Sequence, residues 1–87
     1  MASYRLVVKK SVSKDLRSLP NKDVVRILQR IEALQSDPRP SGSEKLSGQK
    51  RYRVRQGVYR IVYEITDEVL LVTVVKVGHR RDVDRPG

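Results

Sequence analysis

The residues best suited to chemistry form a row of arginines in the stretch YRVRQGVYRIVYEI, residues 52–65, directly after Lys50 and Arg51. Apolar and basic residues alternate there, as in a strand with one buried face. Between Lys45 and Tyr63 the chain carries basic residues and no acidic one. Guanidinium groups bind phosphate through two parallel hydrogen bonds and stack on bases, so the pattern predicts a sheet surface that binds a polyanion.

The position of the turn in this hairpin determines which residues lie opposite each other. A two-residue turn at Gln56 and Gly57 would place Arg53 opposite Arg60, residue 55 opposite 58 and residue 51 opposite 62. Because like charges that lie opposite each other destabilise a sheet, this register favours a bound anion with several phosphates. One face would carry Tyr52, Val54, Tyr59, Ile61 and Tyr63, and the other Arg51, Arg53, Arg55 and Arg60.

A purely structural interpretation of the same arginines stays open. Their stems would cover apolar sheet surface while their charged ends reach water or the acidic residues Asp82 and Asp84. Past the last strand, His79, Arg80 and Arg81 would add donors at the rim of the surface. His79 also fits a structural histidine that is hydrogen-bonded near the end of a strand.

The elements around the hairpin have clear sequence signals. Residues 4–8 favour a first strand, and a helical spacing of Val12, Leu16 and Leu19 follows, which Pro20 ends. Residues 36–50 are rich in Ser, Gly and Pro and predict a loop, whereas 69–77 predict a strand covered on both faces after a turn at 67–68. A second helix, from Asn21 to before Pro38, would carry an apolar stripe of Val24, Ile27, Leu28, Ile31 and Leu34.

Together these elements predict one α+β domain over residues 1–87. Its N-terminal strand precedes an antiparallel two-helix hairpin and a three-strand antiparallel meander. The strands would form one small sheet, with the helices packed on one face. The arginines would point from the other face.

Composition narrows the function classes. Nineteen Lys and Arg against ten Asp and Glu give a formal charge of +9, which favours a nucleic acid or an acidic protein as partner. With no cysteine and one histidine, thiolate chemistry and a zinc cluster are excluded. No signal peptide and no apolar run long enough for a membrane span are visible, so we expect a cytoplasmic protein.

The order KLSGQKRYRVRQGVYRIVYEI followed by VVKVGHRRDV resembles the RelE branch of the RelE/ParE toxin superfamily. The resemblance covers residues 4–83, including the Leu-Pro break between the helices. It implies a RelE-like fold and the toxin of a type II toxin-antitoxin system, an endoribonuclease that enters the ribosomal A site and cuts mRNA. It also implies inhibition of translation under stress, a cognate acidic, RelB-like antitoxin, and no metal or other cofactor.

The reaction of the family is an attack of the ribose 2′-hydroxyl on the adjacent phosphate. Carried over by position, Arg53 and Arg55 match two basic strand residues, the second of them a proposed general base. Arg60 matches an arginine that steadies the phosphate, and Arg80 a proposed general acid. The resemblance assigns ribosome contact to Lys9, Lys10, Lys14, Arg17, Arg26 and Arg30, and we expect RNA contact from Lys50, Arg51, His79 and Arg81.

Two departures from the family pattern leave alternatives open. Asp84 stands where many relatives have a tyrosine that stacks on the substrate base. A guanidinium is also a poor base, because its pKa lies above about 12. His79 or Glu64 could take the proton, or charge stabilisation alone could supply the rate. A ParE-like toxin that binds DNA gyrase and a non-catalytic nucleic-acid-binding or antitoxin-binding module are the alternative functions.

Overall fold

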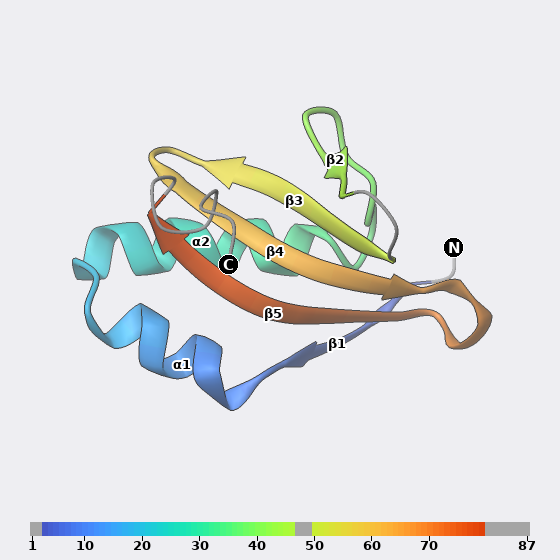
Figure 1. Cartoon of the computed structure of the whole chain (residues 1–87), viewed down its shortest axis with the longest axis horizontal. Coiled ribbons are helices and arrows are strands. Elements are labelled where there is room, and N and C mark those ends of the chain that lie inside the picture. Colours follow the sequence, from blue (N-terminus) through green and yellow to red (C-terminus); the bar gives the residue numbers. More distant parts are fainter. Residues whose placement is uncertain (1–2, 47–49, 80–87) are drawn as a thin grey trace.

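The computed structural model of the chain describes residues 3–46 and 50–79 (Figure 1). Within these ranges, no helix is long and apolar enough to cross a membrane. The predicted α+β architecture is confirmed. In chain order the elements are β1 (Arg5–Val8), α1 (Lys10–Arg17), α2 (Asn21–Ala33), β2 (Glu44–Lys45), β3 (Arg51–Gln56), β4 (Tyr59–Thr66), the 3-10 turn η1 (Asp67–Val69) and β5 (Leu71–His79).

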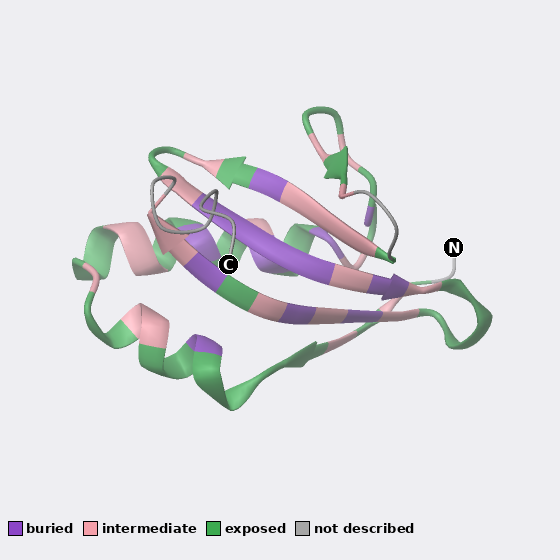
Figure 2. Cartoon of the chain, in the orientation of Figure 1, coloured by how far each residue is buried: buried purple, intermediate pink, exposed green. Residues whose placement is uncertain are grey.

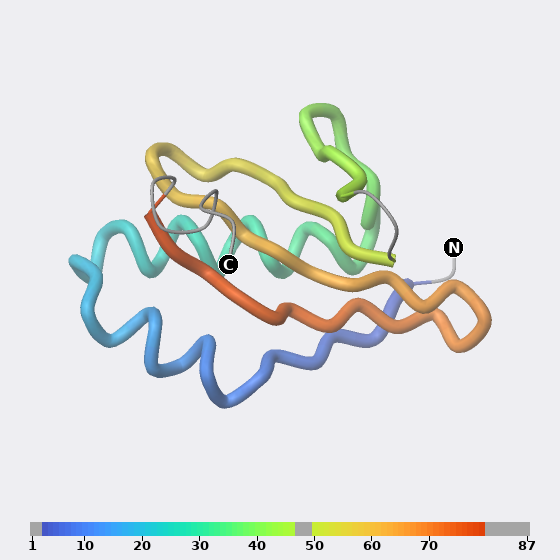
Figure 3. Tube along the Cα trace, in the orientation of Figure 1, coloured from blue at the N-terminus to red at the C-terminus, as the bar shows by residue number. Residues whose placement is uncertain are grey.

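The strands form one sheet in the order β1-β5-β4-β3-β2. The predicted meander β3-β4-β5 is confirmed, and the Cα trace shows β4 and β5 running side by side along a common curve (Figure 3). Two features were not predicted. The first strand pairs with β5 in parallel, and β2 is a two-residue edge strand inside the segment 36–50 that was expected to be a loop.

Both helices cover the same face of the sheet, as predicted, because α1 packs against β5 and α2 against β3 (Figure 1). Burial is greatest along β4, at the centre of the sheet (Figure 2). Removing these apolar side chains from water is the main favourable term for a domain of this size. The core contains Val12, Ile27, Ile31, Leu34, Val54, Ile61, Tyr63, Ile65, Val72, Val74 and Val77.

The predicted register of the β3–β4 hairpin is wrong by two residues, because Arg60 lies opposite Arg55 and not opposite Arg53. The turn residues are Gly57 and Val58, so that Gln56 pairs with Tyr59 and Arg55 pairs with Arg60. Gly57 has a φ of 60°, and a glycine at the first position of a two-residue turn is the requirement of a type II′ hairpin. Both registers leave the same residues on each face, so the predicted faces are confirmed.

Of the expectations for η1 and β5, the turn is confirmed and burial of the strand on both faces is wrong. The turn expected at Asp67 and Glu68 is present as a 3-10 turn over Asp67–Val69, which Leu70 ends with a left-handed φ of 49°. The strand is also buried on only one face: Val72, Val74 and Val77 are buried, whereas the outward side chains are partly or fully exposed. The alternation of buried and outward residues along β5 is interrupted once. Tyr63 pairs with Val74 but the preceding residue, Val62, pairs with Lys76, so Val75 is the extra residue of a β-bulge.

Alkaline pH should destabilise the fold through Tyr63. This side chain is fully buried, its hydroxyl donates a hydrogen bond of 2.7 Å to the carbonyl oxygen of Pro38, and burial raises the pKa of the hydroxyl to about 12. The pKa of a tyrosine in the unfolded chain is near 10. The stabilisation of the fold by the neutral Tyr63 hydroxyl is therefore complete below pH 10, and about 2–3 kcal/mol of it is lost as pH rises from about 10 to 12.

Urea unfolding at intervals between pH 8.5 and 12 measures this loss. The variant Tyr63→Phe should show a much shallower decline. Its free energy of unfolding at pH 8.5 should be about 1 kcal/mol lower than that of the wild type, because the Pro38 carbonyl loses its hydrogen-bond donor. An equally steep decline in the variant would mean that other groups cause the alkaline loss.

Candidate nucleic-acid interface

Four arginines share the face of the sheet that points away from the helices, hereafter the arginine face. Residues directly opposite in an antiparallel pair lie on the same side of a sheet. Val54 and Ile61 are opposite each other and buried in the core, so their neighbours along each strand must point outward. These neighbours are Arg53, Arg55, Arg60 and Val62, and the same alternation along β3 adds Arg51.

The centre of the arginine face is the pair Arg55 and Arg60, directly opposite each other across the β3–β4 ladder. Arg55 is exposed, whereas Arg60 is only 9% exposed. On the other side of Arg60 stands Gly78 of β5, which has no side chain to occupy the adjacent space. Arg60 is therefore nearly enclosed by its surroundings, and Arg55 is the more solvent-accessible member of the pair.

Two glutamates also belong to this face and reduce its charge. Arg53 donates a hydrogen bond of 2.5 Å to Glu44, and Arg51 donates one of 3.0 Å to Glu64. The hydrogen bond from Arg53 holds the pKa of Glu44 below its usual value, and the charges of the surrounding arginines add to this effect. Sequence reasoning missed Glu44, because the acid-free stretch begins at Lys45 and β2 has no alternation to reveal it.

Two predicted RNA-binding residues lie on the helix side of the sheet. His79 pairs with Tyr59, whose ring it meets edge-on with centroids 6.4 Å apart. The ammonium group of Lys50 lies 3.7 Å from Glu68, in a cavity that includes the core-facing Ile65. The structure thus brings Arg51, but neither Lys50 nor His79, to the arginine face. Arg80 and Arg81, with the acidic residues Asp82 and Asp84, lie outside the described residues.

The six basic residues expected at the ribosome occupy the helices and the residue before α1. Five of them, Lys9, Lys10, Lys14, Arg17 and Arg26, are exposed. Arg30 is partly buried, and its charge lies close enough to oppose the rise in the pKa of Tyr63. Lys9 differs from the others because it also lines a cavity with Arg51 and Val62 on the arginine face.

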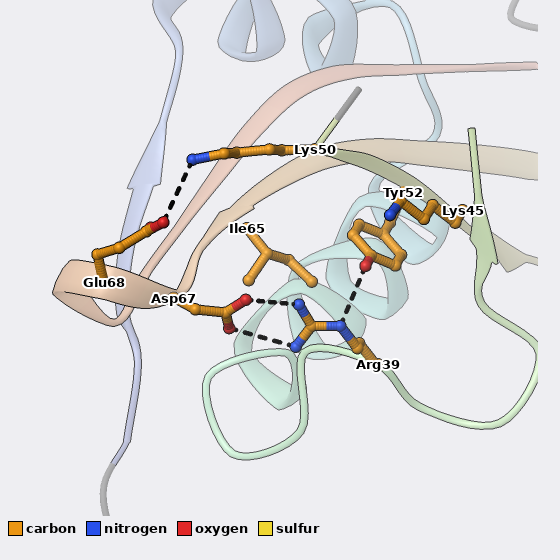
Figure 4. Close-up of a pocket in the computed structure, with 7 residues that line it drawn as sticks. All are labelled: Arg39, Lys45, Lys50, Tyr52, Ile65, Asp67 and Glu68. Atoms are coloured by element: carbon orange, nitrogen blue, oxygen red, sulfur yellow. Dashed lines mark hydrogen bonds and ion pairs between the residues drawn. The ribbon is translucent and has the colours of Figure 1, made fainter. Parts of the chain in front are cut away.

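A cavity of about 410 Å³ among the described residues lies away from the arginine face (Figure 4). Arg39 crosses it, with hydrogen bonds of 2.8 and 3.3 Å to Asp67 and one of 3.1 Å to the Tyr52 hydroxyl. Hydrogen bonds from Arg39 and Tyr4 lower the pKa of Asp67. Because these charges are paired within the chain, the contacts tie the 34–43 segment to η1 rather than form a site for an anion. Across residues 3–46 and 50–79, no group of three or more His, Cys, Asp or Glu side chains is placed to hold a metal ion.

Known proteins share both the sequence pattern and this geometry. The protein family described as "ParE toxin of type II toxin-antitoxin system, parDE" matches residues 6–84. The chain belongs to this toxin family. A putative toxin RelE1 from Methanocaldococcus jannaschii is 28% identical over 81 residues, which cover 88% of this chain and 90% of the relative.

Solved structures place the chain on the RelE side of the family. A RelE–RelB complex from Pyrococcus horikoshii has a TM-score of 0.81 and 31% identity, over 90% of this chain and 96% of the other. The toxin-antitoxin complex RelBE2 from Mycobacterium tuberculosis has a TM-score of 0.78 and 25% identity, over 90% and 99%. The predicted RelE-like fold and the membership in the toxin family are confirmed.

The charge balance of the arginine face should control RNA affinity. The variant Glu44→Gln removes the negative charge that Arg53 contacts, so single-stranded RNA should bind about two- to fivefold more tightly at low salt. The slope of log Kd against log salt should also steepen, because one more phosphate contact forms. Fluorescence anisotropy with a labelled oligonucleotide across a salt series measures both effects.

The matched control is Glu32→Gln, which makes the same change at an exposed position on α2. It should leave affinity within the small change that net charge alone produces. Equal tightening in both variants would mean that the arginine face has no special role in binding RNA.

Proposed function

We propose that this RelE-like toxin is a metal-independent endoribonuclease that cuts mRNA in the ribosomal A site and thereby inhibits translation. One observation carries the proposal: Arg55 and Arg60 lie opposite each other on an exposed sheet face, with Arg53 beside them on β3. Fixed guanidinium groups suit a reaction that accumulates negative charge on a phosphate. Family membership supports the toxin class and leaves the reaction as our proposal.

The proposed reaction is an internal transfer at phosphorus. The 2′-oxygen forms a bond to the adjacent phosphorus while the bond from phosphorus to the 5′-oxygen breaks. The 2′-hydroxyl proton goes to a base and the leaving oxygen receives a proton, which gives a 2′,3′-cyclic phosphate and a 5′-hydroxyl. Arg60, nearly buried, would fix the phosphate, and the exposed Arg55 would close on the developing charge from the solvent side.

Charge stabilisation, rather than a strong base, would supply most of the rate. By the resemblance, Arg55 occupies the position of a residue proposed as general base, but a guanidinium with a pKa above about 12 holds its proton at neutral pH. The carboxylate of Glu64 accepts a hydrogen bond from Arg51, and His79 lies on the helix side of the sheet. Arg80 remains our proposal for the group that protonates the leaving oxygen.

The basic residues away from Arg55 and Arg60 would bind the mRNA and the ribosome. Lys50, Arg51, His79 and Arg81 remain the proposed contacts to RNA. Contact with ribosomal RNA is proposed for the helical residues, where positive charge is exposed on α1 and on α2. These contacts would be sensitive to salt, since lysine and arginine bind phosphate by displacing counterions.

A gyrase-binding toxin is the second candidate, because the matching family is described by the name ParE. Under that proposal the arginine face would be a binding surface without chemistry of its own. Variants of Arg55 and Arg60 would then leave toxicity largely intact. The two candidates therefore differ in a direct measurement of RNA ends.

Cleavage should occur within the A-site codon when the purified chain is incubated with programmed ribosomes, and naked mRNA should stay intact. Arg55→Ala and Arg80→Ala should each reduce the single-turnover rate by about 10²-fold or more, as loss of a charge-stabilising donor does in other enzymes. Primer extension maps the ends, and Lys22→Ala, at an exposed lysine in the first turn of α2, should leave the rate unchanged.

Arg60→Ala should be as damaging as Arg55→Ala, but Arg60 is nearly buried and its loss could unfold the chain. Thermal unfolding of each variant separates the two causes, and the exposed Arg55 is the decisive position. Intact mRNA with wild-type protein that still arrests growth would reject the nuclease proposal in favour of gyrase.

We also propose an acidic, RelB-like antitoxin as partner. Relatives of similar fold were solved as RelE–RelB and RelBE complexes. The physical reason is that a chain with a net charge of +9 and a two-residue edge strand at β2 offers both charge and backbone hydrogen-bonding groups to a peptide. A disordered acidic segment could wrap such a surface as it folds.

Co-expression with the neighbouring gene should yield a short acidic protein that co-purifies with this chain and abolishes its effect on growth. The retained fraction should fall as salt is raised during washing, because charge contributes to the interface. Recovery of the chain alone in high yield, without harm to the host, would contradict this proposal.

A further inference from the structure

A second concavity lies on the arginine face, beside the arginine pair. Its volume is about 330 Å³, within the size range of pockets that hold small molecules, about 300–1,000 Å³. Val62, in its floor, is the next residue after Arg60 on the same face of β4, about 7 Å further along the strand. The described residues that line it are Lys9, Ser11, Leu46, Arg51, Val62, Val75 and Lys76.

The floor of this cavity is apolar. Val62 is 8% exposed, and Val75 is the extra residue at the β-bulge of β5. Leu46 also lines the cavity, and its backbone N–H donates a hydrogen bond of 2.9 Å to the carbonyl oxygen of Arg51. An apolar surface of this kind offers contact to a flat ring and no hydrogen bonds to its face.

The rim of the cavity is cationic. Lys9, Arg51 and Lys76 come from three different parts of the chain, and no carboxylate is among the described lining residues. Arg51 is paired with Glu64 at 3.0 Å, so the two lysines supply the unbalanced charge of the rim. Three cavities elsewhere on the described residues differ from this cavity, because each includes an aspartate. Lys9 and Lys76 are exposed, so that their charges are available to a ligand from solvent.

We propose that this cavity binds the base and ribose of a nucleotide next to the phosphate held by Arg55 and Arg60. A nucleotide combines a flat, largely apolar ring with an anionic backbone, which matches an apolar floor inside a cationic rim. The proposal rests on the proposed function, because it treats the arginine pair as a phosphate site. It goes beyond that function by assigning a base-binding subsite to Leu46, Val62 and Val75.

The test uses the isolated full chain and an uncleavable 2′-O-methyl trinucleotide. A second trinucleotide of the same charge lacks one base, so that the ratio of the two dissociation constants reports contact with the base alone. Wild-type protein should bind the complete oligonucleotide about tenfold more tightly, a typical contribution of one base contact. Moving the abasic position along the trinucleotide identifies the residue that enters the cavity.

Leu46→Ala should reduce this ratio to about twofold or less while binding of the abasic oligonucleotide changes little, because only contact with the base is removed. Val75→Glu should abolish the preference as well. Its matched control is Val58→Glu, the same change at an exposed valine in the β3–β4 turn, which should keep the wild-type ratio. Thermal unfolding confirms that each variant is folded.

Equal or undetectable binding of the two oligonucleotides by wild-type protein would overturn the proposal. So would a Leu46→Ala variant that weakens both oligonucleotides to the same extent, since that result indicates a phosphate site only. No ribosome or cleavage is involved in this measurement. The two proposals can therefore fail independently. The chain could prefer the complete oligonucleotide without cutting mRNA, or cut mRNA without this preference.

Discussion

The structure depends on holding two guanidinium groups opposite each other across the β3–β4 ladder. Arg55 and Arg60 repel, and a like-charged pair costs about 0.2–1 kcal/mol in a sheet. The same register places Val54 opposite Ile61 in the core, and burial of each such side chain contributes about 1.5–3 kcal/mol. The apolar face therefore outweighs the charged face, and a slip by one residue would turn Val54 to solvent and an arginine into the core.

Two glutamates limit the net positive charge of the arginine face. The arginine face has four arginines on β3 and β4, and Glu44 and Glu64 subtract two charges, so that a net of two positive charges remains on these elements. Both glutamates contact arginines of β3, Arg53 and Arg51, toward the end of the hairpin away from its turn. The excess of positive charge consequently lies toward Arg55 and Arg60, near Gly57.

Sequence reasoning identified the faces of the sheet but not all of its registers. Alternation with a period of two fixes which side chains share a face, and this predicted the arginine face. It could not choose between turns at residues 56–57 and 57–58, because both leave every side chain on the same side. Glu44 was missed for another reason, since two residues of β2 among Ser, Gly and Pro form no pattern. Arg80 and Arg81 stay predictions, as they lie outside the described residues.

One extra residue in β5 explains both the position of His79 and the second cavity. Without a bulge, alternation from Val72 and Val74 would send residues 77 and 79 to the arginine face, at whose rim His79 was expected. The bulge at Val75 reverses the phase, so Val77 enters the core and His79 joins Tyr59 on the helix side. It also leaves Val75 and Lys76 together at the cavity, one in its floor and the other on its rim. The sequence signal is the pair of adjacent valines in TVVKV, where strict alternation would have placed a polar residue at position 75.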